Sequence, residues 1–257
     1  MPDRSWDSFV ALGDSFTEGL DDPSGDGGYR GWADRVAESL AAQQPGFRYA
    51  NLAVRGRLLG DVVRDQVPAA VEMRPALVSL VGGVNDILRP RVDLALVGLQ
   101  LEDAVRRLRE SGAEVLLFVG VDPSRRSRLM QRLMPRIHAL NEIVETTASV
   151  YGCRVASLWQ AEVFDDQRLW SPDRLHLSSE GHRRVAGAVL ESLGYGDDSW
   201  REPLAVAGAV GPPSRAATLR EDAQWVRQHF APWLVRRVQG KSSGDGISSK
   251  RPDLTPP

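Results

Sequence analysis

The stretch SFVALGDSFTEG, residues 8–19, sets the interpretation of the whole chain. Its first part, Ser8 to Leu12, is a short apolar run that predicts a buried β-strand. Gly13 ends the run, and Ser15 comes next, where the chain leaves the predicted sheet. A serine in this position can present its hydroxyl group and its backbone N–H to one substrate atom. Because a GDS triplet occurs in many loops, the assignment of Ser15 as a nucleophile requires partner groups elsewhere in the chain.

Two later blocks supply the groups that an activated serine requires. GGVND, residues 82–86, contains an amide, and DRLH, residues 173–176, contains a carboxylate and an imidazole. His176 is the candidate base, and Asp173 can bend back to accept a hydrogen bond from the other ring nitrogen. The predicted helix that begins near residue 178 would disfavour a protonated ring, and a neighbouring carboxylate counters that effect. Together these groups form a complete set for acyl transfer.

An acyl-transfer site also needs hydrogen-bond donors for the oxyanion of the tetrahedral intermediate. Three donors are candidates: the backbone N–H of Ser15, the backbone N–H of Gly56 in NLAVRGR, and the side-chain amide of Asn85. Glycine suits this task because it lets the backbone approach a substrate closely. Loss of one such donor typically lowers turnover by ~10²–10³. We therefore predict an oxyanion hole built from Ser15, Gly56 and Asn85.

Short apolar runs alternate with stretches of helical periodicity along residues 8–193. The apolar runs predict strands at 8–12, 47–52, 76–81, 115–119 and 154–158. The helical periodicity predicts helices at 29–44, 59–67, 94–111, 126–151 and 179–193. This alternation is typical of an α/β fold in which helices cover both faces of a five-stranded parallel sheet. The reactive loops of such sheets lie beyond the carboxyl ends of the strands, where all the candidate residues fall.

The composition of the chain changes after residue 195. We predict a catalytic domain over 1–195 and a linker rich in Gly, Pro, Ala and Asp over 196–213. Residues 214–239 read as an amphipathic helix that docks its apolar face on the domain. Residues 240–257 contain few apolar side chains and are predicted to be disordered.

The overall composition narrows the class of protein. The 257 residues are 42% hydrophobic and 26% charged, with a net charge of −2, so neither nucleic acid nor an anionic membrane is indicated as a partner. No stretch approaches the ~18 apolar residues of a membrane span, and no signal peptide is visible. A lone Cys153 excludes an internal disulfide and fits a reducing compartment, so a cytoplasmic protein is expected. The oligomeric state stays open.

Four blocks, in order and at suitable separations, resemble those of the GDSL or SGNH hydrolases. They are GDSFTEG, Asn51 with Gly56, GGVND and DRLH, and the resemblance covers roughly Phe9 to Leu193. Phe16 stands where the commonest form of the first block has leucine. The resemblance implies a flavodoxin-like α/β/α sandwich and esterase or lipase chemistry without a metal or cofactor. It also implies the triad Ser15, Asp173 and His176, with the oxyanion hole of Ser15, Gly56 and Asn85.

The expected reaction is hydrolysis of a small carboxylic ester through an acyl-enzyme. Mostly apolar residues next to the catalytic blocks are candidates for the substrate pocket: Phe16, Leu58, Val84, Ile87 and Trp170. The sequence does not separate lipid, acetylated sugar, thioester and aryl ester substrates. An acyltransferase, in which an alcohol replaces water, is a close alternative.

Two alternatives belong to other classes of protein. One is a metal-dependent phosphoesterase that uses Asp14, Asp86, Asp173 and His176 around paired metals. The other is a non-catalytic binding module that keeps the fold. The phosphoesterase is disfavoured because we expect the carboxylates of Asp14 and Asp86 to hold loops through hydrogen bonds. His182 is expected to be a packing or surface residue.

Overall fold

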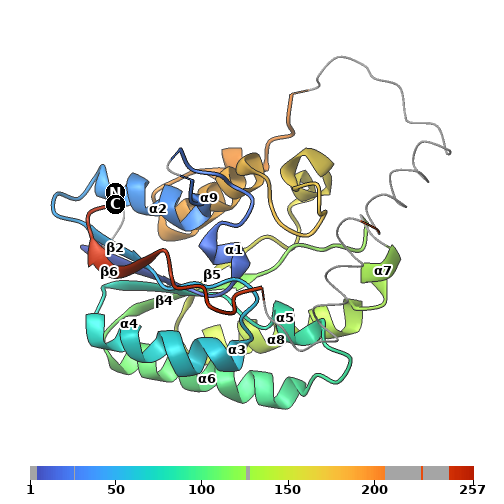
Figure 1. The fold of residues 1–257 in the computed structure, drawn as a ribbon, viewed down its shortest axis with the longest axis horizontal. Coiled ribbons are helices and arrows are strands. Elements are labelled where there is room, and N and C mark those ends of the chain that lie inside the picture. Colours follow the sequence, from blue (N-terminus) through green and yellow to red (C-terminus); the bar gives the residue numbers. More distant parts are fainter. Residues whose placement is uncertain (1–4, 26, 126–127, 206–226, 228–242) are drawn as a thin grey trace.

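A six-stranded sheet forms the centre of the molecule. The computed structural model describes residues 5–25, 27–125, 128–205, 227 and 243–257. The sheet has the order β5-β4-β3-β1-β2-β6, and β1 to β5 are parallel (Figure 1). The strands are β1 (Ser8–Leu12), β2 (Arg48–Asn51), β3 (Leu77–Leu80), β4 (Glu114–Val119), β5 (Arg154–Ser157) and β6 (Arg251–Thr255). Each of the first five coincides with a predicted apolar run to within one or two residues.

Helices cover both faces of this sheet (Figure 1). One face carries α2 (Gly31–Ala41) and α9 (Ser179–Leu193), and the other carries α4 (Val67–Met73), α6 (Leu94–Glu110) and α8 (Met134–Tyr151). Strand β1 contributes to both cores because successive side chains point to opposite faces. Phe9 and Ala11 pack beneath α2, whereas Val10 and Leu12 pack on the side of α6. The predicted three-layer α/β/α sandwich is confirmed.

Shorter helical elements connect these layers. They are α1 (Ser15–Glu18), α3 (Leu59–Asp61), a π-helical turn (Val62–Gln66), α5 (Val84–Ile87), α7 (Arg128–Gln131) and 3₁₀ turns at Glu162–Asp165, Gln167–Leu169 and Asp198–Arg201. The predicted helix over 126–151 is divided between α7 and α8. Pro135 lies in the first turn of α8, where its missing N–H costs no helical hydrogen bond, so a new helix begins there.

The sixth strand corrects the expectation that residues 240–257 are disordered. Residues 251–255 pair antiparallel with β2, with Tyr49 opposite Thr255 and Asn51 opposite Arg251 (Figure 1). Without β6, β2 would be an edge strand with unpaired backbone groups, and backbone hydrogen bonding does not require apolar side chains. Strand β6 therefore could not be predicted from hydrophobicity, because the segment contains few apolar side chains.

The predicted C-terminal helix over 214–239 lies outside the described residues. Of the predicted linker over 196–213, the described part includes the 3₁₀ turn Asp198–Arg201. Trp200 in this turn is buried, and its Nε1 donates to Glu191 of α9 across 2.8 Å. This part of the predicted linker is therefore packed onto the domain.

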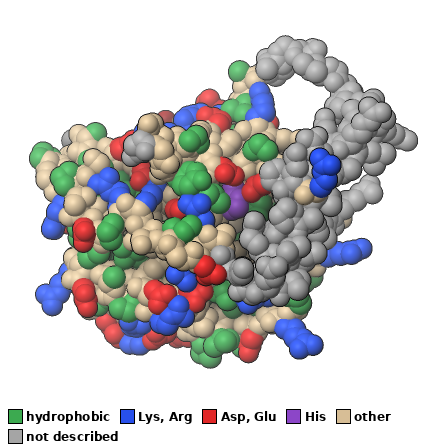
Figure 2. Space-filling model, in the orientation of Figure 1, with side chains coloured by type: hydrophobic (Ala, Val, Ile, Leu, Met, Phe, Trp, Pro, Cys, Tyr) green, Lys and Arg blue, Asp and Glu red, His purple; other side chains and the backbone are tan. Residues whose placement is uncertain are grey.

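The molecular surface is mixed in charge. Figure 2 shows acidic and basic side chains interspersed over the visible face, with an imidazole bordered by acidic and hydrophobic side chains. Among the helices described, none is long and apolar enough to cross a membrane.

Candidate active site

Ser15 begins α1 at the carboxyl end of β1. Asp14 caps this helix, and its Oδ1 accepts a hydrogen bond from the backbone N–H of Phe16 across 3.1 Å. The buried side chain of Gln66 pairs with both polar groups of Gly13: the Gly13 N–H donates to Oε1 (2.8 Å), and Nε2 donates to the Gly13 carbonyl (2.9 Å). Gln66 was missed in the sequence, because a polar residue within a predicted helix carries no motif. These contacts hold the turn that presents Ser15.

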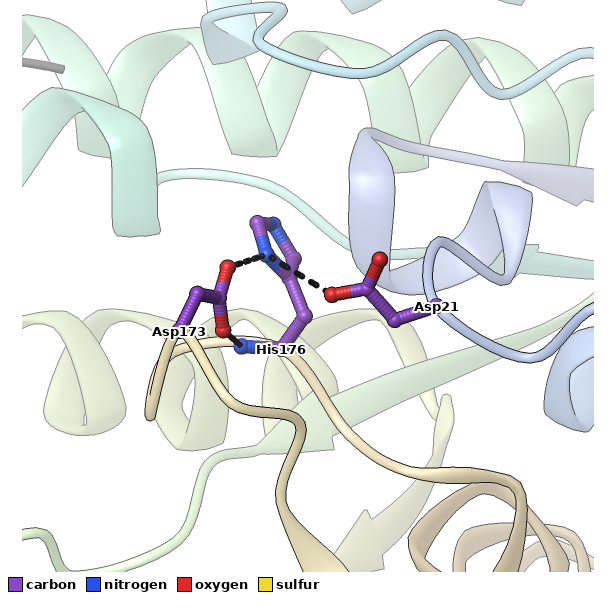
Figure 3. A group of neighbouring side chains, drawn as sticks. All are labelled: Asp21, Asp173 and His176. Atoms are coloured by element: carbon purple, nitrogen blue, oxygen red, sulfur yellow. Dashed lines mark hydrogen bonds and ion pairs between the residues drawn. The ribbon is translucent and has the colours of Figure 1, made fainter. Parts of the chain in front are cut away.

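Asp173 and His176 lie in the loop that precedes α9 (Figure 3). Oδ1 of Asp173 accepts from the Ser171 hydroxyl (2.6 Å) and from the backbone N–H of His176 (2.9 Å). Oδ2 is then directed at the imidazole, 2.5 Å from Nδ1 of His176. The carboxylate is therefore oriented by its own loop before it contacts the ring.

The same imidazole reaches Ser15. Nε2 of His176 lies 3.0 Å from Oγ of Ser15, which is 161 residues away in the sequence. An ionised Asp173 can only accept hydrogen bonds, so Nδ1 carries the proton and Nε2 is free to accept from the serine hydroxyl. The arrangement can therefore remove the proton of Ser15 and return it to a leaving group.

Electrostatic interactions favour a basic His176. Burial lowers the pKa of the imidazole, but the hydrogen bond and negative charge of Asp173 outweigh burial, and Asp21 and Asp14 add to the effect. The pKa of His176 is consequently raised above its ordinary 6.5. Burial opposes ionisation of Asp173 as well, yet the hydrogen bond and charge of His176 hold the pKa of this carboxyl well below its usual range.

A second carboxylate, Asp21, also faces the imidazole of His176. Its Oδ2 lies 4.0 Å from Nδ1 of His176, and its side chain is 38% exposed. Figure 3 shows the imidazole between Asp173 and Asp21, which come from loops far apart in the sequence. Asp21 was not predicted from the sequence. Only its position soon after the GDSFTEG block could have pointed to it.

The described residues do not group the four side chains expected for a paired-metal phosphoesterase. Asp14 bonds to Phe16, and Oδ2 of Asp86 accepts from the backbone N–H of Leu59 (3.0 Å), so both carboxylates hold loops as expected. Within the described parts of the chain, Asp21, Asp173 and His176 are close enough to share one ion. An ion there would require the ring nitrogen that donates to Asp173, so it would break the Ser15–His176–Asp173 chain.

The side-chain amide of Asn85 lies between the other two predicted oxyanion blocks. Its Nδ2 donates to Oδ2 of Asp14 (2.9 Å) and to the carbonyl of Arg57 (3.0 Å). Asn85 therefore contacts the residue before Ser15 and the residue after Gly56. Gly56 has φ of +73°, a left-handed conformation that favours glycine. The three predicted donors thus belong to adjoining loops.

Burial makes Asp14 an unusual carboxyl group. Only 4% of the residue is exposed, and this burial raises its pKa to about 6, against the opposing influence of its hydrogen bond from Phe16 and the charge of His176. The ionised state of Asp14 therefore changes near neutral pH.

The predicted pocket residues occupy different environments. Ile87 is 3% exposed and belongs to the core beneath α6, so its inclusion in a substrate pocket was wrong. Phe16 packs against the rings of Trp32 and Phe118, and Trp170 is held by a hydrogen bond from Nε1 to the Phe164 carbonyl. Leu58 is half-buried.

Two apolar side chains beside the site are open to solvent. Val84, which was predicted, is 45% exposed and adjoins Asn85. Leu175, which was not predicted, is 37% exposed and adjoins His176.

Comparisons with known proteins identify a family for this chain. The model of the GDSL-like lipase/acylhydrolase family matches residues 11–184. No curated protein shows significant sequence similarity to the chain.

Several solved structures share the fold. TesA is 23% identical with a TM-score of 0.61, covering 72% of this chain and 97% of its own. A catalytic mutant of the acetylxylan esterase Axe2 from Geobacillus stearothermophilus is 21% identical with a TM-score of 0.62, covering 76% and 97%. The lipase/acylhydrolase from Enterococcus faecalis is 21% identical with a TM-score of 0.58, covering 73% and 95%.

Proposed function

Because the chain belongs to the GDSL-like lipase/acylhydrolase family, we propose that it is a serine hydrolase that cleaves small carboxylic esters through Ser15, His176 and Asp173. The observation that carries this proposal is the continuous hydrogen-bond chain from the Ser15 hydroxyl through both nitrogens of His176 to Asp173. Each distance lies within hydrogen-bond range, and the tautomer that Asp173 imposes is the one in which His176 can act as a base.

In the first half of the reaction, Nε2 of His176 takes the proton of Ser15 as Oγ bonds to the carbonyl carbon. The carbonyl electron pair moves onto oxygen, and the backbone N–H groups of Ser15 and Gly56 would donate to this oxyanion. The two hydrogens of the Asn85 amide bond to Asp14 and to the Arg57 carbonyl, so this amide would donate to the oxyanion in exchange for its bond to Arg57. Collapse of the intermediate breaks the bond to the alkoxide, which receives the proton from His176. The product is an ester of Ser15.

In the second half, His176 takes a proton from water as the water oxygen attacks the acyl group. The carboxylic acid leaves, and the proton returns to Ser15. Throughout, Asp173 stabilises the positive imidazolium that forms in each half-reaction. If an alcohol replaces water in this step, the same residues perform acyl transfer.

The exposed Val84 and Leu175 favour an ester with an apolar group, since each adjoins a residue of the proposed site. Acetyl and longer acyl esters of p-nitrophenol test this substrate class directly. A larger kcat/KM for the longer acyl chain is expected if these side chains contact it, and each added methylene group contributes at most about 0.8 kcal/mol.

The proposed nucleophile is tested by intact-protein mass spectrometry after treatment with a fluorophosphonate probe. Wild-type protein should gain one adduct, Ser15→Ala should gain none, and EDTA should change neither result. The variant should also lose ester hydrolysis while its melting temperature stays nearly unchanged. An adduct on Ser15→Ala, or an adduct on wild type that EDTA abolishes, would overturn the proposal.

A further inference from the structure

The C-terminal segment Ser243–Thr255 lies outside the part of the chain that the family model matches, yet it contacts the proposed site. The match ends at residue 184, whereas this segment packs against the loop between β2 and α3. That loop carries Gly56, one of the proposed oxyanion donors.

The closest approach is made by Gly244, which is buried. A Cβ atom on Gly244 would lie 2.2 Å from the carbonyl oxygen of Arg55 and 2.9 Å from Cγ1 of Val54. Real Cβ atoms do not approach a backbone oxygen this closely, so only glycine allows the tail to lie directly against the peptide group between Arg55 and Gly56. This contact supports the loop at the carbonyl group of Arg55.

Glu18 holds the same loop at the backbone N–H of Arg55. This residue of α1, three positions after Ser15, is 4% exposed. Its carboxylate accepts from the backbone N–H of Arg55 (2.7 Å) and from Nε of Arg55 (3.0 Å), and it forms an ion pair with the guanidinium. The guanidinium also lies 4.9 Å from the centre of the Tyr29 ring. Arg55 is thereby fixed to the helix that begins with the proposed nucleophile.

The tail is anchored on the C-terminal side of this contact point. Strand β6 pairs with β2, the strand that leads into the loop. Lys250 donates to the carbonyl oxygens of Tyr29 (2.8 Å) and Arg30 (3.0 Å) and pairs with Asp34 at 2.5 Å. These anchors, to β2, to Tyr29 and Arg30 and to Asp34 of α2, fix the chain that follows Gly244.

We propose that Gly244 and Glu18 are positioning residues that clamp Arg55 through the peptide groups on either side of it, and so set the backbone N–H of Gly56 relative to Ser15. This inference rests on the proposed function of Gly56 as an oxyanion donor. A catalytic donor must be held within about 0.5 Å of its working position, and a displacement of about 1 Å can reduce turnover by about 10²-fold. A tail outside the family core therefore takes part in the geometry of the site.

The experiment compares Gly244→Ala and Glu18→Gln with two controls in the full chain. Ser248→Ala changes an exposed residue of the same segment. Glu114→Gln removes the negative charge from another partly buried ion pair, with Arg154. Glu114 is the first residue of β4 and so lies at the amino ends of the parallel strands, away from the proposed site at their carboxyl ends. With p-nitrophenyl acetate, Gly244→Ala and Glu18→Gln should lower kcat about 10- to 100-fold with KM changed less than about threefold. Both controls should retain kcat within about twofold, whatever their effect on melting temperature.

Hydrogen–deuterium exchange on the same four variants supplies a readout that does not depend on turnover. Residues 52–58 should exchange faster in Gly244→Ala and Glu18→Gln than in wild type, and at the wild-type rate in both controls. Unchanged exchange in this segment, or a loss of kcat matched by Glu114→Gln at equal melting temperature, would overturn the clamp. A wild-type protein that neither hydrolyses the ester nor takes up fluorophosphonate would instead overturn the proposed function, and the exchange data alone would then decide whether Gly244 and Glu18 hold the loop.

Discussion

The side-chain amide of Asn85 donates a hydrogen bond to the buried carboxylate of Asp14, with 2.9 Å between Nδ2 and Oδ2. The same nitrogen donates to the carbonyl of Arg57, so one side chain joins the residue before Ser15 to the residue after Gly56. Since burial raises the pKa of Asp14 to about 6, protonation of this carboxyl weakens the link just below neutral pH.

The pH–rate profile should therefore depend on two groups on its acid side. His176 must be neutral to accept the proton of Ser15, and its pKa lies above 6.5; Asp14 must be ionised to hold Asn85, and its pKa is about 6. As the pH falls below about 6, log kcat/KM should decrease with a slope approaching two. Asp14→Asn should reduce the slope to one. A wild-type profile that is flat down to about pH 5 would contradict a histidine base.

Asn85→Ala should lower kcat by ~10²–10³ while changing KM much less, because its amide would bond more strongly to the oxyanion than to the ground-state carbonyl. Steady-state kinetics with p-nitrophenyl acetate measure both constants. Asn141→Ala, on α8, is a matched control and should retain wild-type kinetics. A variant that raised KM and left kcat unchanged would assign Asn85 to ground-state binding instead.

Asp21→Asn should move the acid limb of the profile to lower pH. Asp21 lies 4.0 Å from the ring nitrogen of His176 and is partly exposed, so its charge stabilises the imidazolium by up to about 1 kcal/mol. Removal of this charge should lower the pKa of His176, and added salt should diminish the difference. Asp198→Asn, the same substitution at an exposed residue after α9, should leave the profile in place. The imidazole titration can be followed by NMR, and an unchanged pKa would show that Asp21 is screened by solvent.

His182 should make the stability of the fold depend on pH. Its Nε2 donates to the carbonyl of Leu20 (3.2 Å), and burial lowers its pKa to about 4. Between pH 6.5 and 4 the unfolded chain therefore binds a proton that the folded protein does not, and this contribution to stability is lost as the pH falls. From pH 7 to pH 4.5 the loss should be about 2 kcal/mol, since one pKa unit corresponds to 1.36 kcal/mol.

Urea denaturation of His182→Gln at the two pH values measures this contribution. Between pH 7 and pH 4.5, the free energy of unfolding should decrease by about 2 kcal/mol less in His182→Gln than in wild type. In His138→Gln, which changes an exposed residue, it should decrease as much as in wild type. Equal acid sensitivity of wild type and His182→Gln would show that His182 is not buried in its neutral form.

The sequence predicted the layers of the fold for local reasons. The central strands β1, β3 and β4 are apolar runs, and nearly all of their residues are buried, as is typical of parallel strands covered on both faces. Asp173 and His176 are three residues apart, so their contact follows from a single loop. The contact of Ser15 with His176 could be expected because both come after the carboxyl ends of parallel strands.

Other features carried no local signal. Ile87 appeared to be a pocket residue because it comes soon after Asn85, but the turn of α5 directs it into the core. The bond between Gln66 and Gly13 joins residues 53 positions apart, and nothing in the pattern around Gln66 distinguishes it from a surface glutamine.

By itself, the sequence determined the α/β sandwich and the chemical groups available for acyl transfer, because hydrophobic periodicity and short motifs act over a few neighbouring residues. Only the tertiary structure decided which side chains support those groups. Strand β6 and the contact of Gly244 with Arg55 both join backbone groups that are about 200 residues apart in the sequence. Backbone hydrogen bonds and close backbone contacts do not depend on the hydrophobic pattern of the side chains, so that pattern could not predict them.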